Sequence, residues 1–281
     1  MKADLHVHSD YSDGSDSVET VFKKAKEYGV THISFVDHDT VAGYEAISQL
    51  GEMYGITAIP GIEISAFDFK RDRKVHVLGY DYSPNAYHIK SLCSHILEKR
   101  QAHSLWQIEQ IRQSGIEVDA DLIVAGRDTG TTIYKQHIMN VLTDSPYDSI
   151  HYQNLYKRLF KGKGVASGDI VYADAFDAVR AIKADGGTAV IAHPGQLDSY
   201  DLIPELIEAG LDGIERNHPD HTESDHQKVE RLSDQYNLIM TGGSDYHGHY
   251  GPPTQIGSHQ SPTAELCRNS SKFVGDRYPF Y

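Results

Sequence analysis

The chain has 281 residues, of which 39% are hydrophobic and 23% charged, so it has the composition of a globular protein with an ample core. Its formal net charge of −14 argues against a broad surface for duplex DNA, which needs clustered lysines and arginines. No run approaches the ~18 apolar residues of a membrane helix, and the first residues enter a predicted strand rather than a signal peptide. We therefore expect a cytoplasmic protein without membrane contact.

The first predicted element is a strand around Leu5-His6-Val7-His8. Side chains alternate between the two faces of a strand, so His6 and His8 point the same way and lie about 7 Å apart. Two imidazoles in this arrangement can bind one cation, and Asp13, in the turn after the strand, can add a carboxylate. A half-buried structural pair of histidines explains this motif equally well. Further candidate ligands elsewhere in the chain are needed to favour a metal site.

The next segment alternates helices and strands up to about residue 82. Apolar periodicity predicts a helix that ends at Gly29. It then predicts a strand over Thr31–Val36, a helix over Tyr44–Tyr54, and two strands over Thr57–Ile64 and Val75–Tyr80. The first of these strands runs into His38, and the other two carry Glu63 and His76. Candidate metal ligands therefore recur with the strands.

The alternation then breaks for almost ninety residues. The segment 83–169 reads mostly as helices, with the longest over Ile89–Ser114. We interpret 83–169 as a helical insertion that forms a subdomain on the substrate side. The remaining segments, 1–82 and 170–281, are then the two parts of one domain.

After the insertion the alternation resumes. The predicted helices and strands are, in order, Phe176–Ala184, Thr188–Ala192, Leu202–Ala209, Asp212–Arg216, Ser224–Tyr236 and Leu238–Thr241. The first of these strands is followed by His193, and the last precedes Asp245 and His247. Seven strands, most of them followed by a helix, predict an α/β chain with a parallel sheet, and we expect a distorted (β/α)7 barrel. Such barrels carry their active sites at the C-terminal ends of the strands.

Nine potential ligands are expected at, or just after, the C-terminal part of a strand: His6, His8, Asp13, His38, Glu63, His76, His193, Asp245 and His247. They are too many for one structural zinc, which takes four ligands. Imidazoles combined with carboxylates suit manganese, iron or zinc better than magnesium. A carboxylate such as Glu63 can bridge two cations at the separation used in phosphoryl chemistry. We predict two to three divalent transition metals.

These motifs resemble those of the PHP (polymerase and histidinol phosphatase) family of metal-dependent phosphoesterases. The matching residues are His6 and His8, Asp37-His38, His193, and Ser244–His247. The resemblance implies a trinuclear metal site and attack by a metal-bound water, with no protein nucleophile assigned. It implies ligands for the first metal at His6, His8, Glu63 and Asp245, for the second at Asp13, His38 and His247, and for the third at Glu63, His76 and His193. Some relatives have histidine at the position of Asp13.

The insertion resembles that of the PHP subgroup that hydrolyses nucleoside 3′,5′-bisphosphates and trims short RNA from its 5′ end. Relatives carry Arg-Pro-His where this chain has Lys135-Gln136-His137. We expect a small phosphorylated substrate, a nucleotide, with contacts from Lys135, His137, Arg216 and His218. Lys161, Lys163 and His221 are left without a role. The alternatives are a histidinol-phosphate phosphatase, which would use the same metals, and a non-catalytic metal-binding module.

Overall fold

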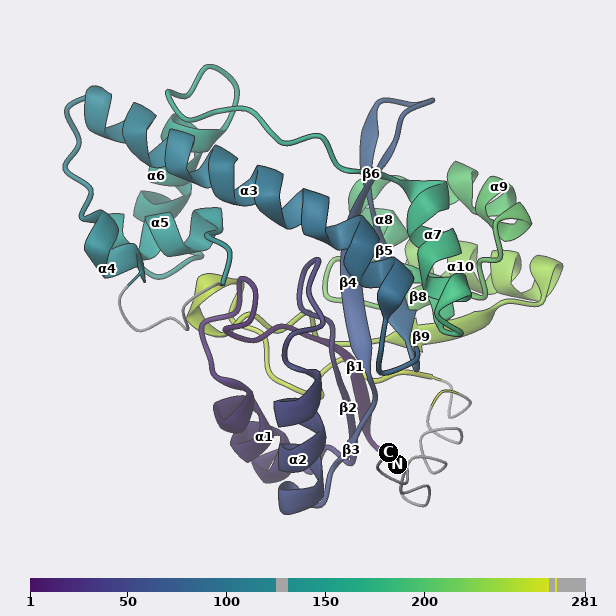
Figure 1. Cartoon of the computed structure of the whole chain (residues 1–281). Helices are drawn as coiled ribbons and strands as arrows, with labels where there is room; N and C mark the ends of the chain where they lie inside the picture. Colours follow the sequence, from purple (N-terminus) through teal and green to yellow (C-terminus); the bar gives the residue numbers. More distant parts are fainter. Residues whose placement is uncertain (125–130, 263–265, 267–281) are drawn as a thin grey trace, which may run out of the picture.

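The computed structural model describes residues 1–124, 131–262 and 266. Figure 1 shows a central group of strands, with helices on both sides and a separate group of helices beyond the long helix α3. The first sheet has the order β1-β2-β3 and comprises Ala3–Val7, His32–Phe35 and Thr57–Ala58. The second has the order β6-β4-β5-β7-β8-β9 and comprises Ala173–Asp174, Gly61–Asp68, Arg73–Tyr80, Thr188–Ile191, Gly213–Asn217 and Ile239–Gly242. The predicted α/β architecture is confirmed.

The predicted strand Thr57–Ile64 is divided between the two sheets. β3 pairs with β2, whereas β4 begins at Gly61 and pairs with β5 and β6. Pro60 stands between them, and a proline has no N–H to donate to a ladder of hydrogen bonds. The described residues consequently form more strands than the seven predicted.

The prediction of a parallel sheet is wrong for β5, which runs antiparallel to both β4 and β7. Only residues 69–72 separate β4 from β5. A connection of this length closes a hairpin, whereas a parallel crossover needs a dozen or more residues. The other pairs of neighbouring strands are parallel, as predicted.

Two isolated bridges link the sheets, one between Val7 and Tyr246 and one between His38 and Glu63. Gly243 allows the chain after β9 to pass directly over β1, because a Cβ at this position would lie 2.2 Å from the backbone nitrogen of His6. The backbone N–H of Asp245 then donates to the carbonyl of His6 at 2.8 Å. The first strand, β1, and the segment that follows the last strand, β9, therefore lie side by side at the candidate ligands.

Helices cover the sheets on their outer faces (Figure 1). α1 (Val18–Glu27) and α2 (Tyr44–Tyr54) pack on the first sheet around Phe22 and Phe35. The helices beside the second sheet are α7 (Ala175–Ala184), α8 (Pro194–Leu197), α9 (Ile203–Glu208) and α10 (Glu223–Tyr236), with the short 3-10 turn η1 (Tyr200–Leu202) before α9. A second 3-10 turn, η2 (Gly248–Tyr250), follows β9. Side-chain oxygens of Ser17 and Asp174 cap α1 and α7, which fixes where these helices begin.

The segment predicted as a helical insertion contains α3 (Tyr87–Gln113), α4 (Ala120–Val124), α5 (Lys135–Leu142) and α6 (Ile150–Phe160). α3 begins beside the second sheet and extends to the other three helices (Figure 1). There, Ile111, Ile138 and Phe160 belong to an apolar cluster that is separate from those of the sheets. The division into 1–82 with 170–281 and 83–169 stays a prediction. None of the helices in the described ranges combines the length and apolar character needed to cross a membrane.

Candidate metal centre

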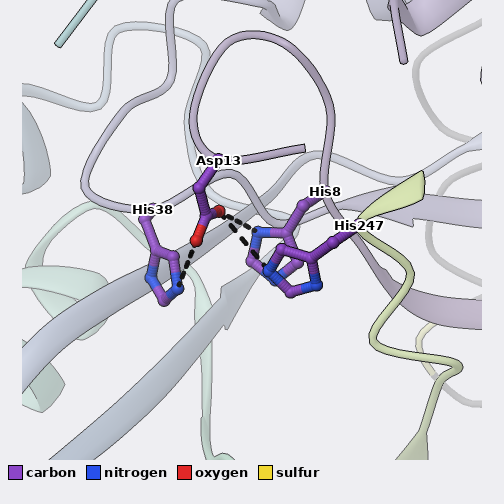
Figure 2. Close-up of side chains that lie close together, drawn as sticks. All are labelled: His8, Asp13, His38 and His247. Atoms are coloured by element: carbon purple, nitrogen blue, oxygen red, sulfur yellow. Dashed lines mark ion pairs between the residues drawn. The ribbon is translucent and has the colours of Figure 1, made fainter. Parts of the chain in front are cut away.

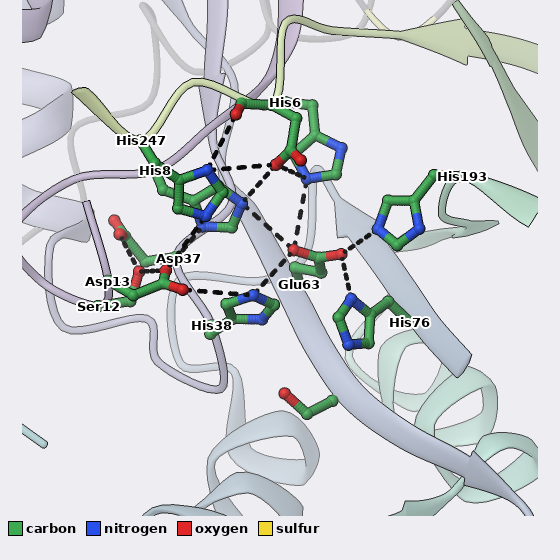
Figure 3. Close-up of polar contacts among 12 residues, drawn as sticks. His6, His8, Ser12, Asp13, Asp37, His38, Glu63, His76, His193 and His247 are labelled. Atoms are coloured by element: carbon green, nitrogen blue, oxygen red, sulfur yellow. Dashed lines mark hydrogen bonds and ion pairs between the residues drawn. The ribbon is translucent and has the colours of Figure 1, made fainter. Parts of the chain in front are cut away.

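The structure brings all nine predicted ligands together at one end of the sheets, and Figure 3 labels all of them except Asp245. They form four overlapping groups whose nitrogen and oxygen atoms lie within 4.8 Å of one another. The groups are His8, Asp13, His38 and His247; His6, Glu63 and His193; His6, His8 and Asp245; and His38, Glu63 and His76. Shared members make this one extended cluster.

The strands and turns hold these side chains in place. In β1, the apolar side chains of Leu5 and Val7 are buried, and the alternation turns His6 and His8 together toward the cluster. His193 and Asp245 lie in the short turns after β7 and β9 and adopt φ values of 24° and 50°. Positive φ is unfavourable for a residue with a Cβ and concentrates at functional sites, where the surrounding structure enforces it.

His76 reaches the cluster by a different route from that predicted. It is the fourth residue of β5, and so it does not lie in the C-terminal part of its strand. Because β5 runs antiparallel to its neighbours, its first half lies beside the ends of the parallel strands. The hairpin therefore delivers His76 to the same end as the other ligands.

Glu63 stands at the middle of the cluster (Figure 3). Its Oε1 lies 2.8 Å from His76 Nδ1 and 2.9 Å from His193 Nε2. Its Oε2 lies 3.3 Å from the Nε2 atoms of both His6 and His8. Burial by itself would raise the pKa of Glu63, but the neighbouring histidines hold it well below its usual range. A carboxylate whose two oxygens face different histidines can bridge two cations.

The group around Asp13 forms the other side of the cluster (Figure 2). Asp13 Oδ1 lies 3.4 Å from His247 Nε2 and 3.7 Å from His8 Nδ1, and Oδ2 lies 4.0 Å from His38 Nε2. The rings of His8 and His247 stack with their centres 4.1 Å apart. His8 thus faces both the Asp13 group and the group that contains Asp245.

The hydrogen bonding of the histidines fits the binding of cations. Both ring nitrogens of His8 are buried without a hydrogen bond, and so are Nδ1 of His38 and Nδ1 of His193. Buried polar atoms without partners are costly, and a cation coordinated by such nitrogens would satisfy them. Burial lowers the pKa of His8, but Asp245 and Glu63 beside it raise the pKa to about 10, because these carboxylates favour positive charge at this ring, which either a proton or a bound cation can supply. Burial lowers the pKa of His38 to about 4, so its ring carries a free lone pair at neutral pH.

Sequence reasoning missed Glu215, which is fully buried behind the cluster. Its Oε1 lies 2.9 Å from His6 Nδ1, and its Oε2 accepts the backbone N–H of His193 at 2.8 Å. His6, His218 and His193 beside it lower the pKa of Glu215 to about 2, against the effect of burial. A carboxylate that accepts the Nδ1 proton leaves Nε2 of the same ring free for a cation. The only available signal was its place in β8, one residue before Arg216.

Asp37, which belongs to the Asp37-His38 motif, supports the turn after β1. The Asp37 carboxylate accepts the backbone N–H and the hydroxyl of Ser9 at 2.8 and 2.7 Å, and the hydroxyl of Ser12 at 2.6 Å. These bonds fix the turn that carries Asp13. Asp37 therefore orients a loop rather than an imidazole.

Two of the predicted substrate contacts, Lys135 and His137, lie in the first turn of α5. Nδ1 of His137 accepts the backbone N–H of Tyr134 at 2.9 Å, so this buried ring helps to begin the helix. Lys135 is half-buried, and no acidic side chain in the described ranges lies within ion-pair distance of it. Burial, together with Lys74, Lys161 and Arg100 nearby, lowers the pKa of Lys135 to about 8, although Asp169 opposes this.

The other two, His218 and Arg216, point to different places. His218 is buried, and its Nε2 lies 3.3 Å from Asp245 Oδ2. Arg216 instead donates to Glu230 of α10 at 2.6 and 2.9 Å. Because side chains alternate along β8, Glu215 faces the cluster and Arg216 faces the helix.

The residues left without a role also have places in the structure. Nε2 of His221 accepts the N–H of Gly195 at 3.0 Å, and its Nδ1 lies 2.8 Å from the carbonyl of Arg216, so this ring connects two loops. The Lys161 ammonium lies 5.7 Å from the ring centre of Tyr156. Lys163 is exposed.

A cavity of about 250 Å³ adjoins the cluster. His218, Asp245 and His247 line one side, and Gln136 and Tyr147 reach it from the helical insertion. Its other lining residues include Gln196, Tyr250 and Thr254. The cavity therefore offers a polar space for a small substrate between the candidate ligands and the insertion.

Residues 4–113 match the model of the PHP domain family. The phosphoribosyl 1,2-cyclic phosphate 1,2-diphosphodiesterase of Eggerthella lenta is 50% identical over 257 residues, covering 92% of this chain and 98% of that protein. The 3′,5′-nucleoside bisphosphate phosphatase of Chromobacterium violaceum is 29% identical over 278 residues, covering 94% of this chain and 93% of its own.

A solved structure gives the same picture. A Bifidobacterium adolescentis protein, assigned only by class as a metal-dependent phosphoesterase, superposes with a TM-score of 0.85 at 26% identity and covers 95% of this chain and 94% of its own. These similarities run through both the strands and the insertion, and the relatives named by activity all cleave phosphate esters. The alternative of a non-catalytic module is therefore set aside. The chain belongs to the PHP family of metal-dependent phosphoesterases and is a hydrolytic enzyme that acts on phosphate esters.

Proposed function

We propose that this enzyme opens the cyclic phosphodiester of a phosphoribosyl 1,2-cyclic phosphate. The substrate is a ribose that carries one phosphate to be attacked and a second phosphate that is not. Water adds to phosphorus, one P–O bond of the ring breaks, and the released sugar oxygen takes up a proton. The observation that supports this choice over other phosphate esters is the 50% identity to the Eggerthella lenta enzyme across nearly the whole length of both chains.

We assign the nine clustered residues as metal ligands, in the three sets that the family resemblance implies. Bound divalent cations supply an activated water and neutralise charge on the phosphate under attack. The chain's own residues set the geometry. Glu63 presents one oxygen to each side of the cluster, and Glu215 fixes the tautomer of His6. The cavity beside His218 and His247 admits the sugar.

The phosphate that is not attacked needs positive charge outside the metal ligands. Lys135 is the candidate that we favour, because its neighbours Tyr134 and Gln136 both bond to residues of the cluster. Lys74 lies two residues from His76 and therefore on the same face of β5, but its ammonium is paired with Asp169, so we propose no phosphate contact for it. His218 is the second proposed contact. We propose no contact for Arg216 or His137, because Glu230 and Tyr134 already engage them.

A nucleoside 3′,5′-bisphosphate is the second candidate substrate. Like the cyclic phosphate, it is a ribose that carries two phosphates. The Chromobacterium violaceum phosphatase, whose match covers 94% of the present chain, acts on such compounds. The same metal ligands and the same lysine would serve both substrates. Short RNA with a 5′-phosphate presents related chemistry.

A comparison of substrates tests the proposal. Protein loaded with manganese, with its metal content verified by elemental analysis, is assayed against four compounds: phosphoribosyl 1,2-cyclic phosphate, a nucleoside 3′,5′-bisphosphate, a short 5′-phosphorylated RNA and histidinol phosphate. We expect the highest kcat/KM for the cyclic phosphate. A higher value for the bisphosphate would establish the second candidate instead, and activity on histidinol phosphate alone would contradict both.

The role of Lys135 is tested in the same assay with Lys135→Met. A charge-assisted contact to phosphate contributes about 1.5–3 kcal/mol, so kcat/KM should fall by about tenfold to a hundredfold for substrates with two phosphates. A simple phosphate monoester should lose far less. Lys157→Met is the matched control, because Lys157 is an exposed lysine in the same group of helices. Equal losses on both kinds of substrate would show that Lys135 does not hold the second phosphate.

A further inference from the structure

Among the described residues of the helical insertion, three side chains form hydrogen bonds with the metal centre or with the residue next to a ligand. The Tyr134 hydroxyl donates to the carbonyl of His38 at 2.9 Å. Arg100 of α3 donates to Asp39 at 2.7 Å, next to His38 in the chain. Gln136 donates from Nε2 to Oδ2 of Asp13 at 2.8 Å. Among these three contacts, only that of Gln136 reaches the side chain of a candidate ligand.

Asp13 needs such a partner because it lies in a turn and not in a strand. Apart from the candidate ligands His8, His38 and His247, the other donor near its carboxylate within the described residues is the Ser12 hydroxyl. It lies at a long 3.4 Å from Oδ1 and much closer to Asp37, at 2.6 Å. Gln136 binds the other oxygen, Oδ2. This bond fixes the rotation of the carboxylate, so that Oδ1 faces His8 and His247 (Figure 2).

Gln136 is itself held firmly. It is half-buried in the first turn of α5, and the bond between the Tyr134 N–H and His137 fixes the start of that helix. An amide is also well suited to this position. It donates a hydrogen bond but carries no charge, so it orients a carboxylate without competing with a cation for it.

From this geometry we infer that Gln136 is a positioning residue for the cation site formed by His8, Asp13, His38 and His247. The inference rests on the proposed metal-dependent function and extends it: the insertion, and not the sheets alone, completes this site. The affinity of the site for a cation then depends on where the insertion lies. Gln136 also lines the substrate cavity, so the same side chain connects the cavity and the site.

The test is Gln136→Met, which keeps the length of the side chain and removes the donor. Protein freed of metal by chelation is titrated with Co²⁺ or Mn²⁺, and bound metal is followed by visible absorption or by electron paramagnetic resonance. Loss of a residue that orients a ligand typically weakens metal binding by about 10–100-fold. We expect this loss of affinity at one cation-binding site, while the affinities of the other cation sites stay unchanged. The urea midpoint of unfolding of the metal-free protein should also stay unchanged.

Two further variants separate this role from others. Gln113→Met is the matched control, because Gln113 belongs to the same group of helices, is exposed, and donates to Glu109 of its own helix α3. In an Asp13→Ala background, Gln136→Met should weaken cation binding no further. A loss that persists in that background would reveal a general structural role and would overturn the inference.

Other outcomes are also decisive. An unchanged cation affinity combined with a raised KM would make Gln136 a substrate contact and would overturn its positioning role. Failure of the wild-type protein to bind any of these cations would instead contradict the proposed function. The two failures are therefore distinguishable in the same titration.

Discussion

The metal centre consists mainly of ionisable side chains, whereas the helical insertion is held together by apolar ones. The centre gathers histidines and carboxylates that are mostly buried, on strand ends whose backbone includes the positive φ angles of His193 and Asp245. The insertion has an apolar cluster of its own, with Ile111, Ile138 and Phe160 among its members. It meets the centre through polar side chains rather than through that cluster.

Because of this difference, we expect the ionisable side chains to supply the activity and the apolar clusters to supply the stability. Buried ionisable groups do not stabilise a fold by themselves, because each loses its hydration. The sheets must therefore hold the ligands in place by means of their own apolar clusters, which contain Ile62, Val77 and Ile191. We expect changes within the centre to affect catalysis and metal binding, and changes at the contacts with the insertion to affect stability as well.

The largest effect should come from Glu63→Gln. An amide cannot bridge two cations as a carboxylate does, so we expect kcat/KM to fall by more than about a hundredfold, the upper end of the loss caused by residues that only orient ligands. Metal content should fall while the fold persists. Glu109→Gln is the control, since Glu109 is exposed on α3. Wild-type metal content and rate in Glu63→Gln would refute our assignment of the bridge.

Next in size is the loss of the buried ion pair between Arg100 and Asp39, whose side chains are 15% and 0% exposed. Removing one partner of a buried pair leaves an unpaired charge and costs about 3–5 kcal/mol. Arg100→Met should lower the free energy of unfolding by this amount in urea titrations. The double variant with Asp39→Asn should lose less than the sum of the single variants. Additive losses would show that the two side chains do not depend on each other.

A smaller effect is expected for Glu215→Gln, which tests the support behind the ligands. The amide can accept the N–H of His193 and then presents its NH₂ to Nδ1 of His6, which moves the ring proton to Nε2. That nitrogen faces Glu63 and Asp245 and would no longer have a lone pair for a cation. Metal affinity should fall by about 10–100-fold. Titration of Glu230→Gln provides the control, and equal affinities in the two variants would remove Glu215 from the site.

The smallest effect should come from a position outside both regions. Asp225, the third residue of α10, forms a capping box with Thr222 at the start of this helix, and its bonds to Thr222 lower its pKa to about 2. A folded-state pKa below the unfolded value of about 3.9 means that the ionised carboxylate stabilises the fold above about pH 4 and that this contribution is lost as the pH falls toward 2. Asp225→Ala should cost about 0.5–2 kcal/mol at pH 7. In urea titrations, the difference in free energy of unfolding between the wild type and Asp225→Ala should be smaller at pH 3 than at pH 7. An equal difference at both pH values would show that the ionised carboxylate is not the source of the stabilisation.

Local patterns in the sequence predicted much of this architecture. The helix Tyr44–Tyr54 has the predicted bounds, and the long helix of the insertion begins and ends within two residues of the prediction. Such elements follow from apolar periodicity and end signals within a few residues of one another. The alternation in β1 similarly predicted that His6 and His8 share a face, and the structure places both in the cluster.

Contacts between distant segments were decided only by the tertiary structure. The pattern of β5 marked it as a strand but did not give its direction, and that direction is what brings His76 to the other ligands. Glu215 and His6 are separated by 209 positions, and Gln136 and Asp13 by 123. Periodicity specifies which face of an element is buried, but a polar partner on another element is selected by how the sheets and the insertion pack. For that reason the sequence identified the candidate ligands, and the structure alone showed which residues orient them.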